Sequence, residues 1–228
     1  MCGRFTLVTP AERWAQLFGV ESQESRPRYN IAPGQDIVVV RTRPETGREA
    51  VQLRWGLVPA WASDPKIGHR LVNARGESLA EKPAFRDALR RRRCLVVADG
   101  FYEWAGSKAP RRPHWFHRPD GAPLAIAALW ERWTPRGDAD APPLETCTLV
   151  TTAANATVGA VHERMPALIA PEDFGRWLGE GEGGGEGDAV ALLRPCPDDW
   201  LTARAVGPRV NDARQDDPAC LEPASPES

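Results

Sequence analysis

The hydrophobic positions of the chain fall into short runs separated by turn-forming residues, a pattern typical of β-strands. These apolar runs lie at residues 36–41, 50–55, 94–98, 124–130 and 145–152. The first two flank a polar stretch at residues 43–48, so we expect them to pair as a hairpin. Residues 28–33 are rich in turn formers and predict a loop before the first of these strands.

Helical patterns are fewer. Thr9 is a candidate N-cap for a helix over residues 11–18, with Pro10 in its first turn. Residues 79–92 predict a second helix, and Ala170-Pro171-Glu172 predict the start of a third that runs through Trp177 and Leu178. Short strands, few helices and 22 prolines favour an α+β fold. We expect one domain on a curved, largely antiparallel, barrel-like β-sheet with flanking helices.

Composition marks the expected limits of this domain. Residues 179–188 are rich in Gly and Glu and predict a flexible surface insert. Residues 215–228 are rich in Asp, Pro and Ser and predict a disordered acidic tail. The domain is therefore expected to span residues 1–214.

Overall composition excludes several classes of protein. The charged fraction is 26% and the hydrophobic fraction 42%, which is ordinary for a soluble globular chain. No apolar run approaches the roughly 20 residues of a membrane span, and no secretory pattern opens the chain. We therefore expect a cytoplasmic protein, associated with the nucleoid when it is bound to DNA. The five cysteines form no C-x-x-C pair, so we expect neither a metal site, nor a cofactor, nor a disulfide framework.

Charge is distributed unevenly along the chain. The net charge is −2, yet residues 1–118 carry 21 basic against 12 acidic side chains, and residues 119–228 carry 8 against 19. This asymmetry permits a basic binding face on an acidic protein.

Cys2 stands directly after the initiator methionine, and that position is chemically informative. Side chains as small as cysteine generally permit removal of Met1, which leaves a free α-amine beside a thiol. The amine titrates near about 7.7–8.0 and the thiol near about 8.5, so both are partly deprotonated at neutral pH. Such a pair condenses with an aldehyde to an imine and then closes to a thiazolidine ring. The alternative is that position 2 holds a small residue only so that Met1 can be removed.

Three further segments join polar side chains to Gly, Pro or Trp near expected strand ends or in loops. The first brings Asn73 and Arg75 after an apolar start, and the second sets Glu103 between aromatic residues. A carboxylate in apolar surroundings tends to have a raised pKa, which suits acid–base chemistry. The third places His162 beside charged residues and shortly before a proline.

Six motifs in order carry a resemblance to a known family. They are Met1-Cys2-Gly3-Arg4-Phe5, Arg28-Tyr29-Asn30-Ile31-Ala32-Pro33-Gly34, Trp55-Gly56-Leu57-Val58-Pro59, Asn73-Ala74-Arg75-Gly76-Glu77, Gly100-Phe101-Tyr102-Glu103-Trp104 and His162-Glu163-Arg164-Met165-Pro166. Together they resemble the SOS-response-associated peptidase (SRAP) family, which senses abasic sites in single-stranded DNA. The resemblance extends to about residue 211.

The resemblance implies a role for each motif. Cys2 would form the thiazolidine with the ring-opened sugar aldehyde of an abasic site, and this DNA–protein crosslink would shield the site. Asn73 would hold Cys2 and the sugar in register, Glu103 would assist proton transfers, and His162 would open the sugar and help to reverse the link. The DNA contacts implied by the motifs are Arg4, Asn30, Pro33, Trp61, Arg75, Trp104 and Arg164. The expected partner is single-stranded DNA with abasic sites, bound by a monomer.

Two other functions fit the same residues. Cys2 resembles an N-terminal nucleophile, so the chain could be a cysteine peptidase that removes Met1 autocatalytically and then cleaves other peptides. It could also be a single-stranded DNA binder in which Cys2 is inert. Replacing Cys2 by Ser separates these functions, because only the crosslinking function requires covalent capture of DNA.

Overall fold

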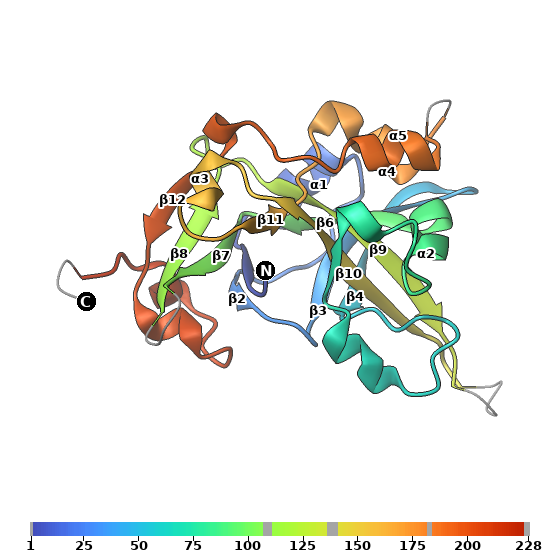
Figure 1. Ribbon diagram of the computed structural model, residues 1–228, viewed down its shortest axis with the longest axis horizontal. Helices are drawn as coiled ribbons and strands as arrows, with labels where there is room; N and C mark the ends of the chain where they lie inside the picture. Colours follow the sequence, from blue (N-terminus) through green and yellow to red (C-terminus); the bar gives the residue numbers. More distant parts are fainter. Residues whose placement is uncertain (1, 107–110, 136–140, 182–183, 226–228) are drawn as a thin grey trace.

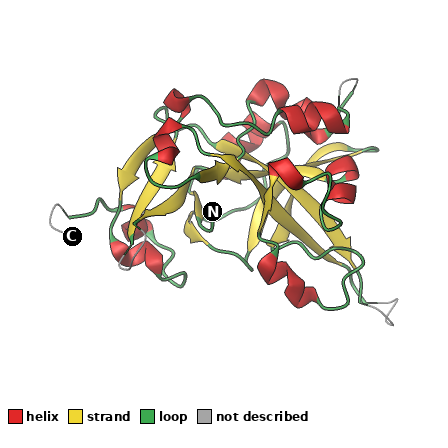
Figure 2. Cartoon of the chain, viewed as in Figure 1, coloured by secondary structure: helices red, strands yellow, loops and turns green. Residues whose placement is uncertain are grey.

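Two β-sheets form the body of the protein (Figures 1 and 2). The computed structural model describes residues 2–106, 111–135, 141–181 and 184–225. The five-stranded sheet has the order β12-β8-β7-β1-β2 and is antiparallel throughout. Its strands are β1 (Phe5–Leu7), β2 (Arg28–Ile31), β7 (Gly100–Ala105), β8 (Arg112–His117) and β12 (Thr202–Ala205).

The seven-stranded sheet closes on itself as a small barrel. The order β10-β4-β3-β6-β9 returns to β10, because β10 also pairs with β9. The barrel strands are β3 (Asp36–Arg43), β4 (Gly47–Trp55), β6 (Arg93–Ala98), β9 (Leu124–Trp133) and β10 (Leu144–Ala153), and β10 further pairs with β5 (Asn73–Arg75) and β11 (Arg164–Pro166). Among the strands that the structure describes, only the pairs β10 with β4 and β10 with β5 are parallel. The expected curved, mostly antiparallel α+β fold is confirmed.

The barrel strands form because their side chains are almost all buried. Every residue of β6 is buried, and β9 is buried from Leu124 to Leu129. Strands buried on both faces read as continuous apolar runs rather than as alternating ones. This is why the sequence pattern located all five barrel strands.

Short helices cover the sheets. They are α1 (Ala11–Phe18), α2 (Arg86–Arg91), α3 (Ala156–Gly159), α4 (Phe174–Leu178) and α5 (Glu186–Ala191). In Figure 1, α1, α4 and α5 lie above the barrel, α2 lies beside it, and α3 lies near β8 and β12. No helix in the described ranges is long and apolar enough to cross a membrane.

The helix boundaries differ from the sequence prediction at two places. The N-cap of α1 is Pro10 rather than Thr9, and the backbone N–H groups of Val8 and Thr9 donate to the carboxylate of Asp99. The helix expected over residues 79–92 is restricted to α2, because Pro83 disfavours helical backbone at the residue before it. A third difference concerns residues 28–33, where β2 replaces the expected loop.

The segment expected to be a flexible insert and the segment expected to be a disordered tail both form specific contacts where the structure describes them. In the insert at residues 179–188, Glu180 forms an ion pair with Arg48 at 2.7 Å, and α5 begins at Glu186. Residues 182–183 of this insert lie outside the described ranges. In the tail at residues 215–228, a 3₁₀ helix spans Pro218–Leu221 and Cys220 is fully buried. Residues 226–228 lie outside the described ranges.

Candidate functional site

Cys2 lies just before β1, between the two sheets, where Figure 1 marks the N-terminus near the centre of the molecule. Its side chain is fully buried, and its Sγ lies 3.9 Å from the carbonyl oxygen of Arg4. Burial raises the pKa of the Cys2 thiol far above its usual range, and the negative charge of Glu103 raises it further. The thiol is therefore protonated at neutral pH. Met1, whose removal the sequence predicts, lies outside the described residues.

Asn73 connects Cys2 to the barrel side of the molecule. It begins β5, which pairs with β10, and its side-chain amide donates to the carbonyl oxygen of Cys2 at 2.7 Å. The Oδ1 atom of Asn73 is buried and has no hydrogen-bond partner among the described residues. A buried acceptor without a donor costs about 1–3 kcal/mol, so this oxygen is suited to receive a donor from a ligand.

Glu103 lies on β7 and is only 3% exposed. Burial raises the pKa of its carboxyl group, and the nearby His162 partly offsets this rise. The carboxyl therefore keeps its proton to a higher pH than an exposed glutamate does. Its charge acts on the thiol of Cys2, which places the two side chains close together.

His162 lies in the turn between α3 and β11 and is half-buried. Its Nδ1 lies 3.0 Å from the backbone nitrogen of Arg164 and 3.1 Å from the carbonyl oxygen of the same residue. The neutral ring can accept from that N–H, and the cationic ring can donate to that oxygen. These two contacts to Arg164 orient the imidazole ring.

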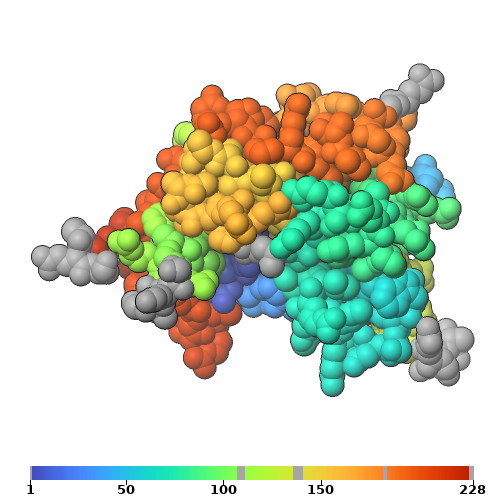
Figure 3. All heavy atoms as spheres, viewed as in Figure 1, coloured from blue at the N-terminus to red at the C-terminus, as the bar shows by residue number. Residues whose placement is uncertain are grey.

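These four residues come from four separate parts of the sequence and meet at one place. Cys2 precedes β1 and Glu103 lies on β7, both in the five-stranded sheet region, whereas Asn73 on β5 and His162 just before β11 lie beside β10. Figure 3 shows a hollow on this face, with the N-terminal segment at its bottom, between the segments coloured teal and gold. The site combines a thiol, a buried carboxyl, a histidine and an amide. Such a set can carry out nucleophilic and acid–base chemistry.

Three of the residues expected to contact DNA are exposed or lie in exposed turns. Trp61 is 52% exposed, and Pro33 lies on the surface in the turn after β2. The Trp61 loop depends on two glycines, since Gly56 has φ 133° and a Cβ on it would lie 2.7 Å from the carbonyl oxygen of Gly68. Arg75 is exposed and forms no ion pair with another described residue. These three remain candidate DNA contacts.

Two other expected DNA contacts are interior residues. Asn30 is fully buried, and its amide donates to the carbonyl oxygens of Val210, Asp212 and Gln215 at 2.8–3.2 Å. Arg4 donates to the Asn30 side chain at 3.1 Å and to the carbonyl oxygen of Val210 at 2.8 Å. Burial lowers the pKa of Arg4. In this structure both side chains bind the C-terminal segment, and Arg4 is half-buried, so their contact with DNA stays a prediction.

Trp104 and Arg164 also have partners within the protein. Trp104 points to the face of β7 opposite Glu103, because side chains alternate along a strand, and its Nε1 donates to Asn211 at 2.6 Å. Arg164 forms a two-point ion pair with Glu77 at 2.6 and 2.9 Å. A phosphate would have to displace Glu77 to reach Arg164.

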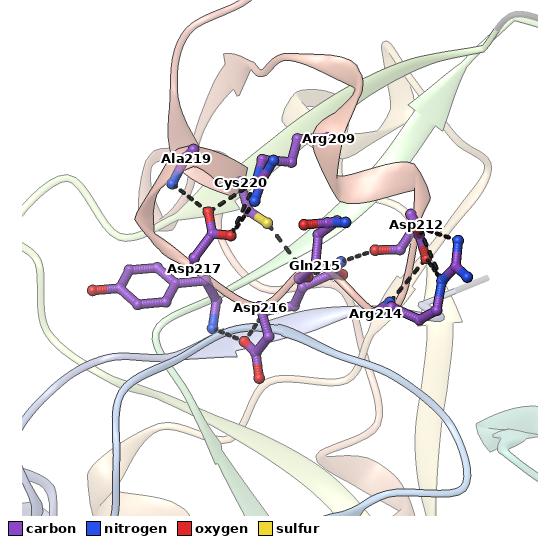
Figure 4. Close-up of polar contacts among 10 residues, drawn as sticks. Arg209, Asp212, Arg214, Gln215, Asp216, Asp217, Ala219 and Cys220 are labelled. Carbon is purple, nitrogen blue, oxygen red and sulfur yellow. Dashed lines mark hydrogen bonds and ion pairs between the residues drawn. The ribbon is translucent and has the colours of Figure 1, made fainter.

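The sequence did not reveal how residues 208–221 support the site. We call this segment the C-terminal strap. The carboxylate of Asp216 accepts from the backbone nitrogens of Tyr29 and Asn30 at 2.6 and 2.9 Å and from the side chain of Arg28. Within the strap, Asp217 bonds Arg209 and Ala219 (Figure 4). The acidic composition of residues 215–228 suggested disorder. The ordered position of Asp216 is explained by the N–H groups of Tyr29 and Asn30, which are distant in the sequence.

No group of three or more His, Cys, Asp and Glu side chains in the described ranges is arranged to hold a metal ion.

Comparison with known proteins identifies relatives along nearly the whole chain. The family model described as SOS response associated peptidase (SRAP) matches residues 1–213. The abasic site processing protein YoqW of Bacillus subtilis is 36% identical over 231 residues, covering 97% of this chain and 99% of that protein. The abasic site processing protein YedK of Escherichia coli is 27% identical, covering 98% of this chain and all of that protein.

Solved structures have the same fold. A crystal structure of a protein from Bacteroides thetaiotaomicron superimposes with a TM-score of 0.86 at 21% identity, covering 98% of this chain and all of that one. A second, from Bordetella bronchiseptica, gives a TM-score of 0.76 at 26% identity, covering 90% of this chain and all of that one.

Proposed function

The chain belongs to the SOS response associated peptidase (SRAP) family, and on that premise we propose that it captures abasic sites in single-stranded DNA as a covalent crosslink. The relatives YoqW and YedK are named abasic site processing proteins. The observation that carries the proposal is the meeting of Cys2, Asn73, Glu103 and His162 around the start of the chain. Each of these residues has a place in one reaction.

The reaction begins with removal of Met1, which frees the α-amine of Cys2. An abasic site opens to an aldehyde, and the amine adds to the aldehyde carbon. Loss of one water gives an imine. The thiol then adds to the imine carbon, closes a five-membered thiazolidine, and its proton ends on the ring nitrogen. One water leaves per crosslink, and no oxidant or cofactor is consumed.

The raised pKa values fit this order of steps. The thiol of Cys2 is held neutral by burial, so the amine attacks first and the thiol adds to the imine afterwards. Glu103, whose carboxyl keeps its proton to a higher pH than an exposed glutamate does, can donate a proton to the departing hydroxyl. His162 protonates the ring oxygen when the sugar opens. The unpaired Oδ1 of Asn73 accepts from the opened sugar while its amide holds Cys2.

The contacts to DNA are sequence-independent. Arg75 supplies the exposed positive charge beside Asn73, and Trp61 supplies an exposed aromatic face on which a base can stack. Contacts of this kind favour a single strand, because its bases are available for stacking.

A peptidase function is less well supported. A buried thiol with a raised pKa is a weak nucleophile toward an extended peptide, because the thiolate is the reactive form. In the crosslinking reaction the amine attacks the aldehyde first, and the thiol then adds to the resulting imine, so no thiolate is needed for the first attack.

Intact mass spectrometry of the protein with a single-stranded oligonucleotide that carries one abasic site tests the proposal. The parent protein should gain the mass of the oligonucleotide minus one water. Cys2→Ser should lose the stable adduct but still bind the DNA non-covalently. Cys196→Ser is the matched control and should react like the parent, since Cys196 is buried against Asn155. A stable adduct in Cys2→Ser would refute the thiazolidine, and an unreactive parent would refute crosslinking altogether.

A further inference from the structure

The face of the five-stranded sheet that carries Glu103 continues beyond the site. Strand register places three side-chain pairs of β7 and β8 along this face, in the order Phe101 with Phe116, Glu103 with His114, and Ala105 with Arg112. The two phenylalanine rings are stacked at 5.3 Å and fully buried, whereas Ala105 and Arg112 approach the surface. Glu103 therefore lies at the border between the core and an open part of the same face.

This open part forms a cleft of about 890 Å³. The alanines Ala105, Ala203 and Ala205 line it from the sheet, and α3 with Val161 forms its opposite wall. Its volume is within the range of small-molecule sites, about 300–1,000 Å³. Val161 directly precedes His162, so the cleft begins next to the acid–base residues. Figure 3 shows α3 and the end of β8 side by side on the face that holds the hollow.

The cleft combines a small-residue, apolar floor with positive charge. Arg111, Arg112 and His114 line it, and none of its described lining residues is acidic. Neither arginine forms an ion pair with a described carboxylate, unlike Arg209 and Arg214 on the C-terminal strap, which pair with Asp217 and Asp212. Available cations beside a flat apolar surface match a planar aromatic group that carries a phosphate.

We propose that this cleft binds one unstacked nucleobase of the DNA strand next to the abasic site, with its phosphate held by Arg112. The proposal rests on the proposed function and extends the site by one nucleotide. The alanines allow close approach of a flat ring, and they discriminate little among the four bases. The strand would thus be held on both sides of the captured sugar, by Arg75 and Trp61 on one side and by the cleft on the other.

Base-omission binding measurements test this subsite. The probe is a single-stranded oligonucleotide with a tetrahydrofuran analogue at the lesion, which has no aldehyde and reports binding alone. One neighbouring nucleotide at a time, within three positions on either side, is also replaced by tetrahydrofuran, which removes the base and keeps the phosphate. We expect omission on one side of the lesion to raise the dissociation constant by about 5- to 150-fold, the range for loss of one stacked base.

Cleft variants assign that effect to this site. Ala205→Leu fills the floor, so it should weaken binding of the intact probe and remove the sensitivity to base omission. Ala191→Leu, at an exposed alanine of α5, should behave like the parent. Arg112→Gln should reduce the slope of log affinity against log salt by about 0.7, whereas Arg13→Gln on α1 should reduce it less. Arg112→Gln tests the same cleft if Ala205→Leu does not fold.

Two results would overturn the subsite. One is a parent protein that is indifferent to every base omission, and the other is an Ala205→Leu variant that keeps the full sensitivity. Neither depends on Cys2, because the probe cannot be crosslinked. Failure of covalent capture would therefore be seen separately, in the mass measurement.

Discussion

The two sheets of this protein differ in how they are stabilised. The barrel encloses apolar side chains, and its strands β6 and β9 are buried over most of their length. The five-stranded sheet is open, and its outer strand β12 is mostly exposed. Its opposite edge, β2, is held by hydrogen bonds to Asp216 and by the buried amide of Asn30.

Because of this difference, the residues that stabilise the core and the residues of the candidate site lie in different parts of the molecule. The barrel strands bury polar side chains of their own, among them Arg41, Glu131 and Thr148, whereas the residues of the candidate site collect where the two sheets meet. Glu103 lies on β7 between Phe101, which is buried in the core, and Ala105, which is partly exposed. A carboxyl at such a border is buried enough to have a raised pKa and near enough to solvent to receive a substrate.

The largest expected effect concerns the chemistry. Glu103→Gln should slow adduct formation, and His162→Ala should slow both formation and release, each by about 10²- to 10⁴-fold. Neither change removes a packed apolar side chain, so thermal unfolding should be nearly that of the parent. The measurement is adduct formation and release over time on denaturing gels. Parent kinetics in both variants would remove these residues from the reaction.

A substitution in the barrel core should lower stability and leave the rate of adduct formation unchanged. Leu129→Ala removes a fully buried side chain from β9 and should lower the free energy of unfolding by about 2–5 kcal/mol. Where the protein is still folded, its rate of adduct formation should match that of the parent. Leu193→Ala, at a half-buried leucine, is the control and should cost less. Denaturant titration measures both, and equal losses would contradict the assigned core.

The C-terminal strap should have an intermediate effect. Asp216→Ala leaves the backbone nitrogens of Tyr29 and Asn30 without their acceptor, which should cost about 1–3 kcal/mol. For a chain of this size that corresponds to a decrease of several degrees in the thermal midpoint. Asp212→Ala removes an exposed ion pair with Arg214 and should be nearly neutral. Equal midpoints for the two variants would show that the strap does not stabilise β2.

Two arginines near the site should differ in their contribution to DNA binding. Arg75 is exposed without a described ion pair, whereas Arg164 is bonded to Glu77. Arg75→Gln should therefore reduce the salt slope of single-strand binding by about 0.7, and Arg164→Gln should reduce it less. Binding titrations over a range of salt measure the slopes. A larger effect from Arg164 would mean that DNA displaces Glu77.

The smallest effect is the pH dependence of stability from Glu103. Its pKa is raised by burial, so between the pKa of an exposed glutamate, about 4.3, and the raised value the folded chain binds more protons than the unfolded chain. The free energy of unfolding should fall as pH rises through that window. Glu103→Gln cannot ionise and should lose this part of the decrease. Unfolding curves at several pH values compare the two, and parallel profiles would contradict the raised pKa.

The apolar barrel strands were predicted from the sequence more accurately than the polar segments β2 and the C-terminal strap. The five barrel strands follow from apolar runs, because burial on both faces leaves a clear pattern. Strand β2 was predicted as a loop because its segment is rich in turn formers and its partners, Phe5 and Asp216, are distant in the sequence. Residues 215–221 of the C-terminal strap fall within the tail that was predicted to be disordered from its Asp, Pro and Ser content.

The site shows the same division. The motifs indicated Cys2, Asn73, Glu103 and His162, and the structure brings these together. The direction of Arg4 and Asn30 could not be predicted, because it depends on carbonyl oxygens of residues 210–215 that no local pattern reveals. Nor could local patterns show that Trp104 donates to Asn211, which is 107 residues away in the sequence.

The bond between Asn73 and Cys2 has a consequence for the protein during its synthesis. Cys2 is synthesised long before its partners are in place. Asn73, which binds Cys2, lies on β5, and β5 is held by the much later strand β10. His162 is made later still. Contacts this distant in sequence form late, because the intervening chain must be made and closed first. Under the proposed function, a nascent chain that has already lost Met1 would present an amino-terminal cysteine to small aldehydes before these contacts form. Rapid folding, or a delay in methionine removal until the fold is complete, would keep the nucleophile for DNA.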